Sequence, residues 1–307
     1  MPTHLPQVAV LLAAYNGMSW IEEQLASILA QRLVGVSIYI SIDPSTDGTE
    51  ACCARYERTY PNIHLLPSSG RFGGAARNFF RLIRDVDLSA FDYVCFADQD
   101  DVWYPNKLER AVEKLCIGDV DGYSSNVVAF WPDGRRMLVD KAQPQVQCDY
   151  LFEAAGPGCT YVLSNSLAMA FKRSVLQQWD EVQYVAMHDW YCYAFARSNG
   201  FNWFIDPAPG MDYRQHAKNQ VGVNAGIASA MSRLRQVALG GWFSQVCLID
   251  SLTGNGKTAL SKRLDLTSRL SLVRLALRFR SCRRRPRDQW AFAVLCLLMA
   301  MFGGIRG

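Results

Sequence analysis

The sequence contains no C-x-x-C motif, no internal repeat and no low-complexity linker. Its ten cysteines are scattered along 307 residues, and only Cys52 and Cys53 are adjacent. This pattern excludes a small disulfide scaffold and favours buried, reduced thiols, which are typical of a reducing compartment. The N-terminus lacks the basic segment and the small-residue cleavage site of a signal peptide. We therefore expect a cytoplasmic protein.

The sequence also lacks a large excess of positive or negative charge, except in one segment. The chain has 32 Lys and Arg against 28 Asp and Glu. Residues 262–287 contain ten basic residues and a single acid, so the rest of the chain has a net charge of −5. This mild acidity argues against a nucleic-acid partner. Half of the residues are apolar, which excludes a disordered or collagen-like chain and allows a sizeable core.

The C-terminal part of the sequence differs in character from the rest. Residues 261–280 are basic and rich in leucine, residues 283–287 read RRRPR, and the uncharged run 289–305 has 17 residues. That run is shorter than the ~20 residues of a membrane-spanning helix. We expect residues 231–307 to form a helical appendage that lies on an anionic membrane surface, at the cytoplasmic face of the inner membrane. The alternative is a helix that packs on the core with a solvated basic face.

Strand and helix signals alternate through the first 120 residues. The pattern predicts strands at 8–14, 36–42, 63–67 and 93–97, and helices at 20–33, from Thr46 or Asp47 to about 60, and at 75–85. This order predicts an α/β fold with a mostly parallel sheet flanked by helices. From about residue 123 the pattern loosens, with short strand-like pieces such as 167–171. Ligands of parallel sheets bind beyond the carboxyl ends of the strands.

The most informative string is FADQDDVW, residues 96–103. Asp98, Asp100 and Asp101 follow a hydrophobic strand, and their charges repel one another unless a cation or hydrogen-bond donors compensate. Mg²⁺ or Mn²⁺ would do so, because these hard cations prefer carboxylates together with phosphate oxygens. On spacing alone, a solvated acidic turn is an equal alternative.

This string resembles the D-x-D motif of nucleotide-sugar-dependent glycosyltransferases with the GT-A fold. Further segments are similar, in order, to glycosyltransferase family 2, most closely to its rhamnosyltransferase-like members. They are AAYNG (13–17), IDPSTDGT (42–49), GGAARNF (73–79), MHDW (187–190) and YRQH (213–216). The similarity spans residues 8–222. Ile42 and Pro44 depart from the family, which usually has an acid and a glycine at these positions.

The resemblance implies a donor-nucleotide site in the first half of the chain. Asp43 would meet the base in a pocket lined by Ala14 and Tyr15, and Asp98 would lie near the ribose. Further nucleotide contacts would come from Gly73, Gly74 and Arg77. From the residues alone, Asp43 could instead be only the first residue of a turn, and Arg77 a solvated helix residue.

The resemblance also implies a metal and a base. Asp100 and His216 would bind the metal, and Asp189 would be the general base. The remaining site residues would shape the site beside donor and acceptor, namely Asp101, Trp103, His188 and Trp190. Asp189 could instead cap a helix, His216 could be a surface histidine, and tryptophans are more often core residues than sugar platforms.

The sequence therefore predicts an inverting, metal-dependent glycosyltransferase. Residues 1–230 would form the GT-A domain, with a nucleotide-sugar half (1–120) and an acceptor half (121–230). The resemblance implies a dTDP- or UDP-sugar donor, with dTDP-L-rhamnose preferred, and a glycan or polyprenyl-linked acceptor for a cell-surface polysaccharide such as O-antigen. Two alternatives remain at this point: a nucleotidyltransferase that makes nucleotide sugars, and a catalytically silent scaffold at the membrane.

Overall fold

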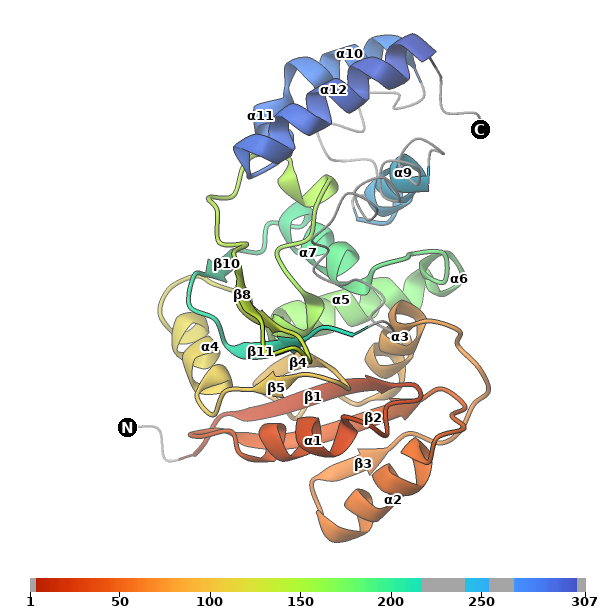
Figure 1. Cartoon of the computed structure of the whole chain (residues 1–307), viewed down its shortest axis with the longest axis vertical. Helices are drawn as coiled ribbons and strands as arrows, with labels where there is room; N and C mark the ends of the chain where they lie inside the picture. Colours follow the sequence, from red (N-terminus) through yellow and green to blue (C-terminus); the bar gives the residue numbers. More distant parts are fainter. Residues whose placement is uncertain (1–3, 217–240, 254–267, 303–307) are drawn as a thin grey trace.

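Two β-sheets form the framework of the protein in the computed structural model, which describes residues 4–216, 241–253 and 268–302 (Figure 1). The larger sheet has seven strands in the order β10-β6-β9-β4-β1-β2-β3. Its strands are β1 (Gln7–Ala14), β2 (Gly35–Ile42), β3 (Ile63–Leu65), β4 (Tyr93–Asp98), β6 (Gly122–Ser125), β9 (Val162–Ser164) and β10 (Trp203–Asp206). The predicted strands of the first half are confirmed, although β3 ends two residues early.

The central strand β1 pairs in parallel with β2 on one side and with β4 on the other. Ala14 is in register with Ile42, and Ala13 with Asp98, so the carboxyl ends of the three strands lie side by side. Strand β9 runs antiparallel between β4 and β6. The sheet is thus mostly parallel, as predicted, and its β1, β2 and β4 ends place the polar turns together.

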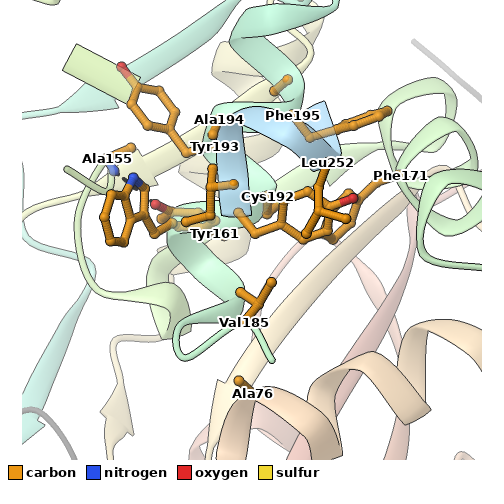
Figure 2. Close-up of a cluster of buried hydrophobic side chains, with 14 of the residues drawn as sticks. Ala76, Ala155, Tyr161, Phe171, Val185, Cys192, Tyr193, Ala194, Phe195 and Leu252 are labelled. Carbon is orange, nitrogen blue, oxygen red and sulfur yellow. Dashed lines mark hydrogen bonds between the residues drawn. The ribbon is translucent and has the colours of Figure 1, made fainter. Parts of the chain in front are cut away.

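Strand β1 is buried on both faces, because its alternate side chains enter two different cores. Val8, Val10 and Leu12 pack with α1 (Ile21–Leu29), α2 (Thr49–Thr59) and α4 (Lys107–Cys116). Ala9 and Leu11 pack with α3 (Ala75–Asp85), α5 (Asn165–Gln177) and α7 (His188–Ser198). In Figure 2, side chains of α7 lie in this second core among Tyr161, Phe171 and Leu252.

The predicted helix at 20–33 ends earlier than expected. Helix α1 stops at Leu29, and Leu33 has a φ of 57° and a side chain that is 62% exposed. The predicted start of α2 is wrong, because the helix begins at Thr49 with Gly48 as its N-cap, although the Asp47 carboxylate accepts the amide of Thr49 at 3.1 Å. Helix α3 has the predicted bounds.

The strand-like piece at 167–171 was a wrong prediction, because these residues belong to α5. Ser164 caps this helix by accepting the amide of Leu167. The buried residues Leu167, Ala168, Phe171, Ser174 and Val175 follow helical rather than strand periodicity.

A smaller sheet of four strands lies beside the large one, in the order β5-β11-β7-β8. Its strands are β5 (Val102–Trp103), β7 (Val127–Phe130), β8 (Arg136–Val139) and β11 (Met211–Arg214). Strand β5 follows the acidic string and pairs with β11, so the string is held between the two sheets. The second half also contains the short helices η1 (Asp149–Leu151), η2 (Gly158–Thr160) and α6 (Trp179–Val182).

The C-terminal part is helical, as predicted, with α9 (Gly241–Thr253), α10 (Arg269–Leu277), α11 (Phe279–Cys282) and α12 (Pro286–Phe302). In Figure 1, α10 to α12 lie at the end of the molecule opposite α2 and β3. Among the described residues, no helix combines the length and apolarity needed to cross a bilayer. The predicted domain boundary at 230, the stretch 217–222 and the first residues of the basic stretch, 261–267, lie outside the described residues.

Candidate active site

A cavity of about 840 Å³ opens where the carboxyl ends of β1, β2 and β4 meet the start of α7. Its lining includes most of the predicted site residues, namely Ala14, Tyr15, Asp43, Gly73, Gly74, Asp98, Asp100, His188, Asp189 and His216. Segments more than 200 residues apart in the sequence thus supply one cleft. A volume of this size is typical of small-molecule and cofactor sites.

Gln99 connects the ends of β1 and β4. Its side-chain oxygen accepts the Tyr15 amide at 2.8 Å, and its side-chain nitrogen donates to the Tyr15 carbonyl at 2.9 Å. A Cβ on Gly17 would lie 2.2 Å from the same Gln99 oxygen, so a larger residue at that position would displace the Gln99 side chain. The Y-N-G turn after β1 and the D-Q-D turn after β4 are therefore held together by the Gln99 side chain.

Asp43 holds the glycine turn that precedes α3. Its two carboxylate oxygens accept the backbone amides of Phe72 and Gly73 at 3.0 and 2.9 Å. Gly73 has a φ of 76°, a conformation that favours glycine. The carboxylate lines the cavity while it fixes the loop, so the turn and its donors are positioned before any ligand binds.

The carboxylates after β4 lie close enough to repel one another. Burial raises the pKa of Asp98, and the charges of Asp100 and Asp189 raise it further. Asp101 is 1% exposed, and burial together with its acidic neighbours raises its pKa well above the usual range. Its Oδ1 accepts the amide of Arg214. Asp98 faces the cavity, whereas Asp101 lies behind it.

Asp100 and His216 meet although they are 116 residues apart, because Oδ2 of Asp100 lies 2.6 Å from Nε2 of His216. The His216 ring stacks on Trp20 with centroids 4.0 Å apart. Oxygen and nitrogen donors at one wall of the cavity, beside the repelling Asp98, fit Mg²⁺ or Mn²⁺. A second group, Asp98, Asp101 and Cys159, also converges within 4.8 Å. It suits these hard cations less well, because burial holds the pKa of Cys159 well above its usual range and the thiol stays protonated.

Asp189 stands in the first turn of α7, at the cavity wall, with 8% of its surface exposed. Burial raises its pKa to about 6, against the opposing backbone hydrogen bonds of Trp190 and Gly158. A Cβ on Gly158 would lie 2.9 Å from the Cβ of Asp189, so this glycine lets η2 approach the carboxylate closely. A carboxylate of this pKa can accept a proton near neutral pH.

His188 precedes Asp189 and is packed between aromatic rings. It stacks on Phe79 with centroids 3.9 Å apart and meets Phe96 edge-on. Burial lowers the pKa of His188 to about 3, so its ring is neutral. The ring therefore shapes the cavity and positions the start of α7, and does not supply a charge.

The sequence matches a model described as "Glycosyl transferase family 2" over residues 9–176. It is also 44% identical over 292 residues to the dTDP-rhamnosyl transferase RfbG of Shigella flexneri, an alignment that covers 95% of this chain and 100% of that protein. The chain belongs to glycosyltransferase family 2. The predicted family and enzyme class, a rhamnosyltransferase-like glycosyltransferase, are therefore confirmed.

Other members and neighbours are more distant. The putative teichuronic acid biosynthesis glycosyltransferase TuaG of Bacillus subtilis is 33% identical over 39% of this chain and 47% of its own length. The crystal structure of S. aureus TarS 1–349 in complex with UDP-GlcNAc superposes with a TM-score of 0.58 at 14% identity, covering 96% of this chain and 81% of that one. The predicted α/β GT-A-type fold is thus confirmed.

Four of the site residues that the family resemblance predicted do not line the cavity of this family 2 enzyme. Arg77 is exposed and donates to the carbonyl of Gln183 at 2.8 Å, so it points away from the nucleotide side. Trp103 is 2% exposed beneath the ammonium of Lys107. Trp190 donates to the Tyr150 carbonyl and stacks on Trp242. Asp101 is the fourth. Arg77 was expected at the nucleotide, and its position corrects that expectation, whereas the other three can shape the site only from behind the cavity wall.

Several cavity residues of this glycosyltransferase were missed by sequence reasoning. Trp20 and Tyr213 flank the Asp100–His216 pair, and Gln99 joins the strand ends. Gln99 lies inside the acidic motif, so its position was the available signal. The basic lining residues Lys141 and Arg285 carry no motif, and nothing local in the sequence points to them.

Proposed function

We propose that this enzyme transfers L-rhamnose from dTDP-L-rhamnose, with inversion at the anomeric carbon, to a glycan or lipid-linked acceptor of a cell-surface polysaccharide. The choice of dTDP-L-rhamnose as donor is supported by the 44% identity, over 95% of the chain, to RfbG, which is named a dTDP-rhamnosyl transferase. The observation that supports transfer is the single cavity that contains Asp43, Asp98, Asp100 and Asp189.

In this proposal Asp189 removes the proton of the acceptor hydroxyl. The oxygen of that hydroxyl forms the new bond to the anomeric carbon, and the bond from that carbon to the β-phosphate oxygen breaks with both electrons leaving on dTDP. One displacement on the face opposite the leaving group inverts the anomeric centre. The pKa of about 6 supports Asp189 as this base, because it is ionised at neutral pH yet basic enough to accept a proton.

Asp98, Asp100 and His216 would hold Mg²⁺ or Mn²⁺, which offsets the negative charge of the donor diphosphate when it is bound. A structural neighbour at a TM-score of 0.50, the mannosyltransferase PcManGT from Pyrobaculum calidifontis, is described in complex with GDP-Man and Mn²⁺. The turn that Gln99 holds through Tyr15 and the glycine turn that Asp43 holds would position the nucleotide beside the metal-binding residues.

The test is an incubation of the protein with dTDP-L-rhamnose, UDP-glucose or GDP-mannose, with Mn²⁺ or with EDTA. We expect dTDP release that requires acceptor and Mn²⁺, and a product of inverted configuration by NMR. Pyrophosphate released from dTTP and a sugar phosphate would identify a nucleotidyltransferase instead. Binding of dTDP without any turnover would favour the silent scaffold.

We also propose that the appendage lies on the anionic cytoplasmic face of the inner membrane. One face of α12 packs inward through Phe292 and Cys296, while the other exposes apolar side chains, namely Trp290, Val294, Leu297, Leu298 and Met301. Such a face beside basic residues is typical of a helix that lies in the membrane interface. Trp290→Glu should reduce co-sedimentation with anionic vesicles. The matched control Leu176→Glu, at an exposed apolar position on α5, should not.

A further inference from the structure

One part of the cavity wall is rich in basic residues. Acidic residues line the side formed by the ends of β2 and β4, and cations line another part of the same surface, namely Arg71, Lys141, Arg283, Arg285 and Arg287. Arg283 and Arg285 come from the segment that precedes α12, and Arg287 lies in the first turn of that helix, so the appendage contributes directly to the cavity.

Arg284 fixes the segment in place. Its side chain is fully buried, donates to Asp149 at 3.1 Å and donates to the Ala154 carbonyl at 2.7 Å. Its amide donates to Glu153 at 2.7 Å. The backbone at Arg283 is extended, and neighbouring side chains of an extended chain point in opposite directions. Burial of Arg284 therefore turns its neighbours toward the cavity.

Two cations of this wall form no ion pair within the described residues, although the charge of Glu153 acts on Lys141 and that of Asp140 on Arg285. Within the described part of the chain, neither the ammonium of Lys141 nor the guanidinium of Arg285 makes a hydrogen bond, although both side chains are half-buried. The nearby carboxylate of Glu153 is already engaged by Arg283 and Arg284. Burial lowers the pKa of Lys141, and the charge of Arg285 lowers it further. Grouping cations in this way costs free energy unless an anion binds there.

These cations lie on the side of the cavity where Asp189 stands. The charge of Lys141 reaches Asp189 and lowers its pKa. Between them runs the segment 156–158: a Cβ on Gly156 would touch Lys141, and one on Gly158 would touch Asp189. The base accepts its proton from the acceptor, so Lys141 lies on the side of the cavity where the acceptor would be bound.

We propose that Lys141 and Arg285, with Arg287 at the rim, form a second anion site that binds the phosphate or diphosphate of the acceptor. The acceptor is then a glycosyl phosphate ester, such as one linked to a lipid. This inference rests on the proposed glycosyl transfer. Arginine and lysine are the side chains best suited to phosphate oxygens, which arginine can bind with two parallel hydrogen bonds.

The test titrates the full-length protein with farnesyl diphosphate, pyrophosphate and farnesol, each with and without saturating dTDP and Mg²⁺. We expect Lys141→Gln and Arg285→Gln to bind farnesyl diphosphate about tenfold or more weakly than wild type. Farnesol binding should be the same in all proteins. The control Arg274→Gln, an exposed position on α10 outside the cavity, should match wild type. A larger affinity for farnesyl diphosphate than for pyrophosphate identifies a lipid-linked acceptor, and equal affinities identify a site for the phosphate alone.

Two results would overturn the inference. One is unchanged farnesyl diphosphate affinity in both variants. The other is a loss of dTDP affinity in place of farnesyl diphosphate affinity, which would assign the cations to the donor. Failure of the wild type to bind dTDP would instead contradict the proposed function, and the titrations without nucleotide would still decide the anion site.

Discussion

The nucleotide half and the C-terminal appendage obtain their site residues in different ways. In the first half, each polar turn follows directly from a strand, and the parallel pairing of β1, β2 and β4 brings these turns together. In the appendage, the run 283–287 looks uniformly solvated, yet Arg284 is fully buried against Asp149, which lies 135 residues earlier. Local sequence patterns thus specify where the site residues of the nucleotide half lie, whereas the positions of the appendage's site residues depend on the contact between Arg284 and the distant Asp149.

The largest expected effect tests the chemistry at the start of α7. Asp189→Asn keeps the shape of the side chain and removes the base, so kcat should fall by about 10²–10⁴-fold. The affinity for dTDP, measured by calorimetry, should change little, because the nucleotide half is untouched. Near-normal turnover by the variant would remove Asp189 as the base.

The next effect tests the appendage. Arg284→Ala leaves Asp149 buried with Arg197 as its one remaining ionic partner among the described residues, and should lower the free energy of unfolding by about 3–5 kcal/mol. Arg287→Ala is the matched control, because that side chain is 85% exposed and its loss should cost about 0.5 kcal/mol or less. Chemical denaturation measures both. Equal stabilities for the two variants would mean that the run is solvated throughout.

A smaller effect tests the close packing of η2 against the start of α7. In Gly158→Ala the new Cβ would press on Asp189 and on Nε2 of His188, and should lower kcat by about ten- to a hundredfold. Gly210→Ala is the control, because its Cβ would lie 3.2 Å or more from Lys107 and Ser125, neither of which lines the cavity. If both variants retain full activity, close approach at Asp189 is not required.

The smallest effect is the pH dependence of transfer. The base acts when ionised, and burial raises the Asp189 pKa to about 6. The value of kcat should therefore be level above about pH 7 and fall about tenfold per unit below pH 6. A profile that stays flat down to pH 4.5 would show that Asp189 ionises as an ordinary exposed carboxylate.

The sequence predicted the sheet and the acidic motif well, because strand periodicity and the turns after β1, β2 and β4 are local features. It was wrong at 167–171, where apolar spacing fits a helix but the short window suggests a strand. Arg77 was expected at the nucleotide, yet its side chain donates a hydrogen bond to the carbonyl of Gln183, 106 residues further along the chain. Burial of Trp103 and Trp190 depends in the same way on packing partners that no motif encodes.

The meeting of Asp100 with His216 was expected only through the family resemblance, since 116 residues separate them. Lys141 and Arg285 could not be predicted at all, because their position depends on how Arg284 is anchored. Charge composition describes a surface, and it does not say which charges face a cavity.

The most direct measurement is calorimetric binding of dTDP to wild type and to Asp100→Asn, each with Mn²⁺ and with EDTA. The account predicts that Mn²⁺ raises the affinity of wild type by about tenfold or more and leaves that of the variant unchanged. Equal dTDP affinity of the wild type in Mn²⁺ and in EDTA would contradict it.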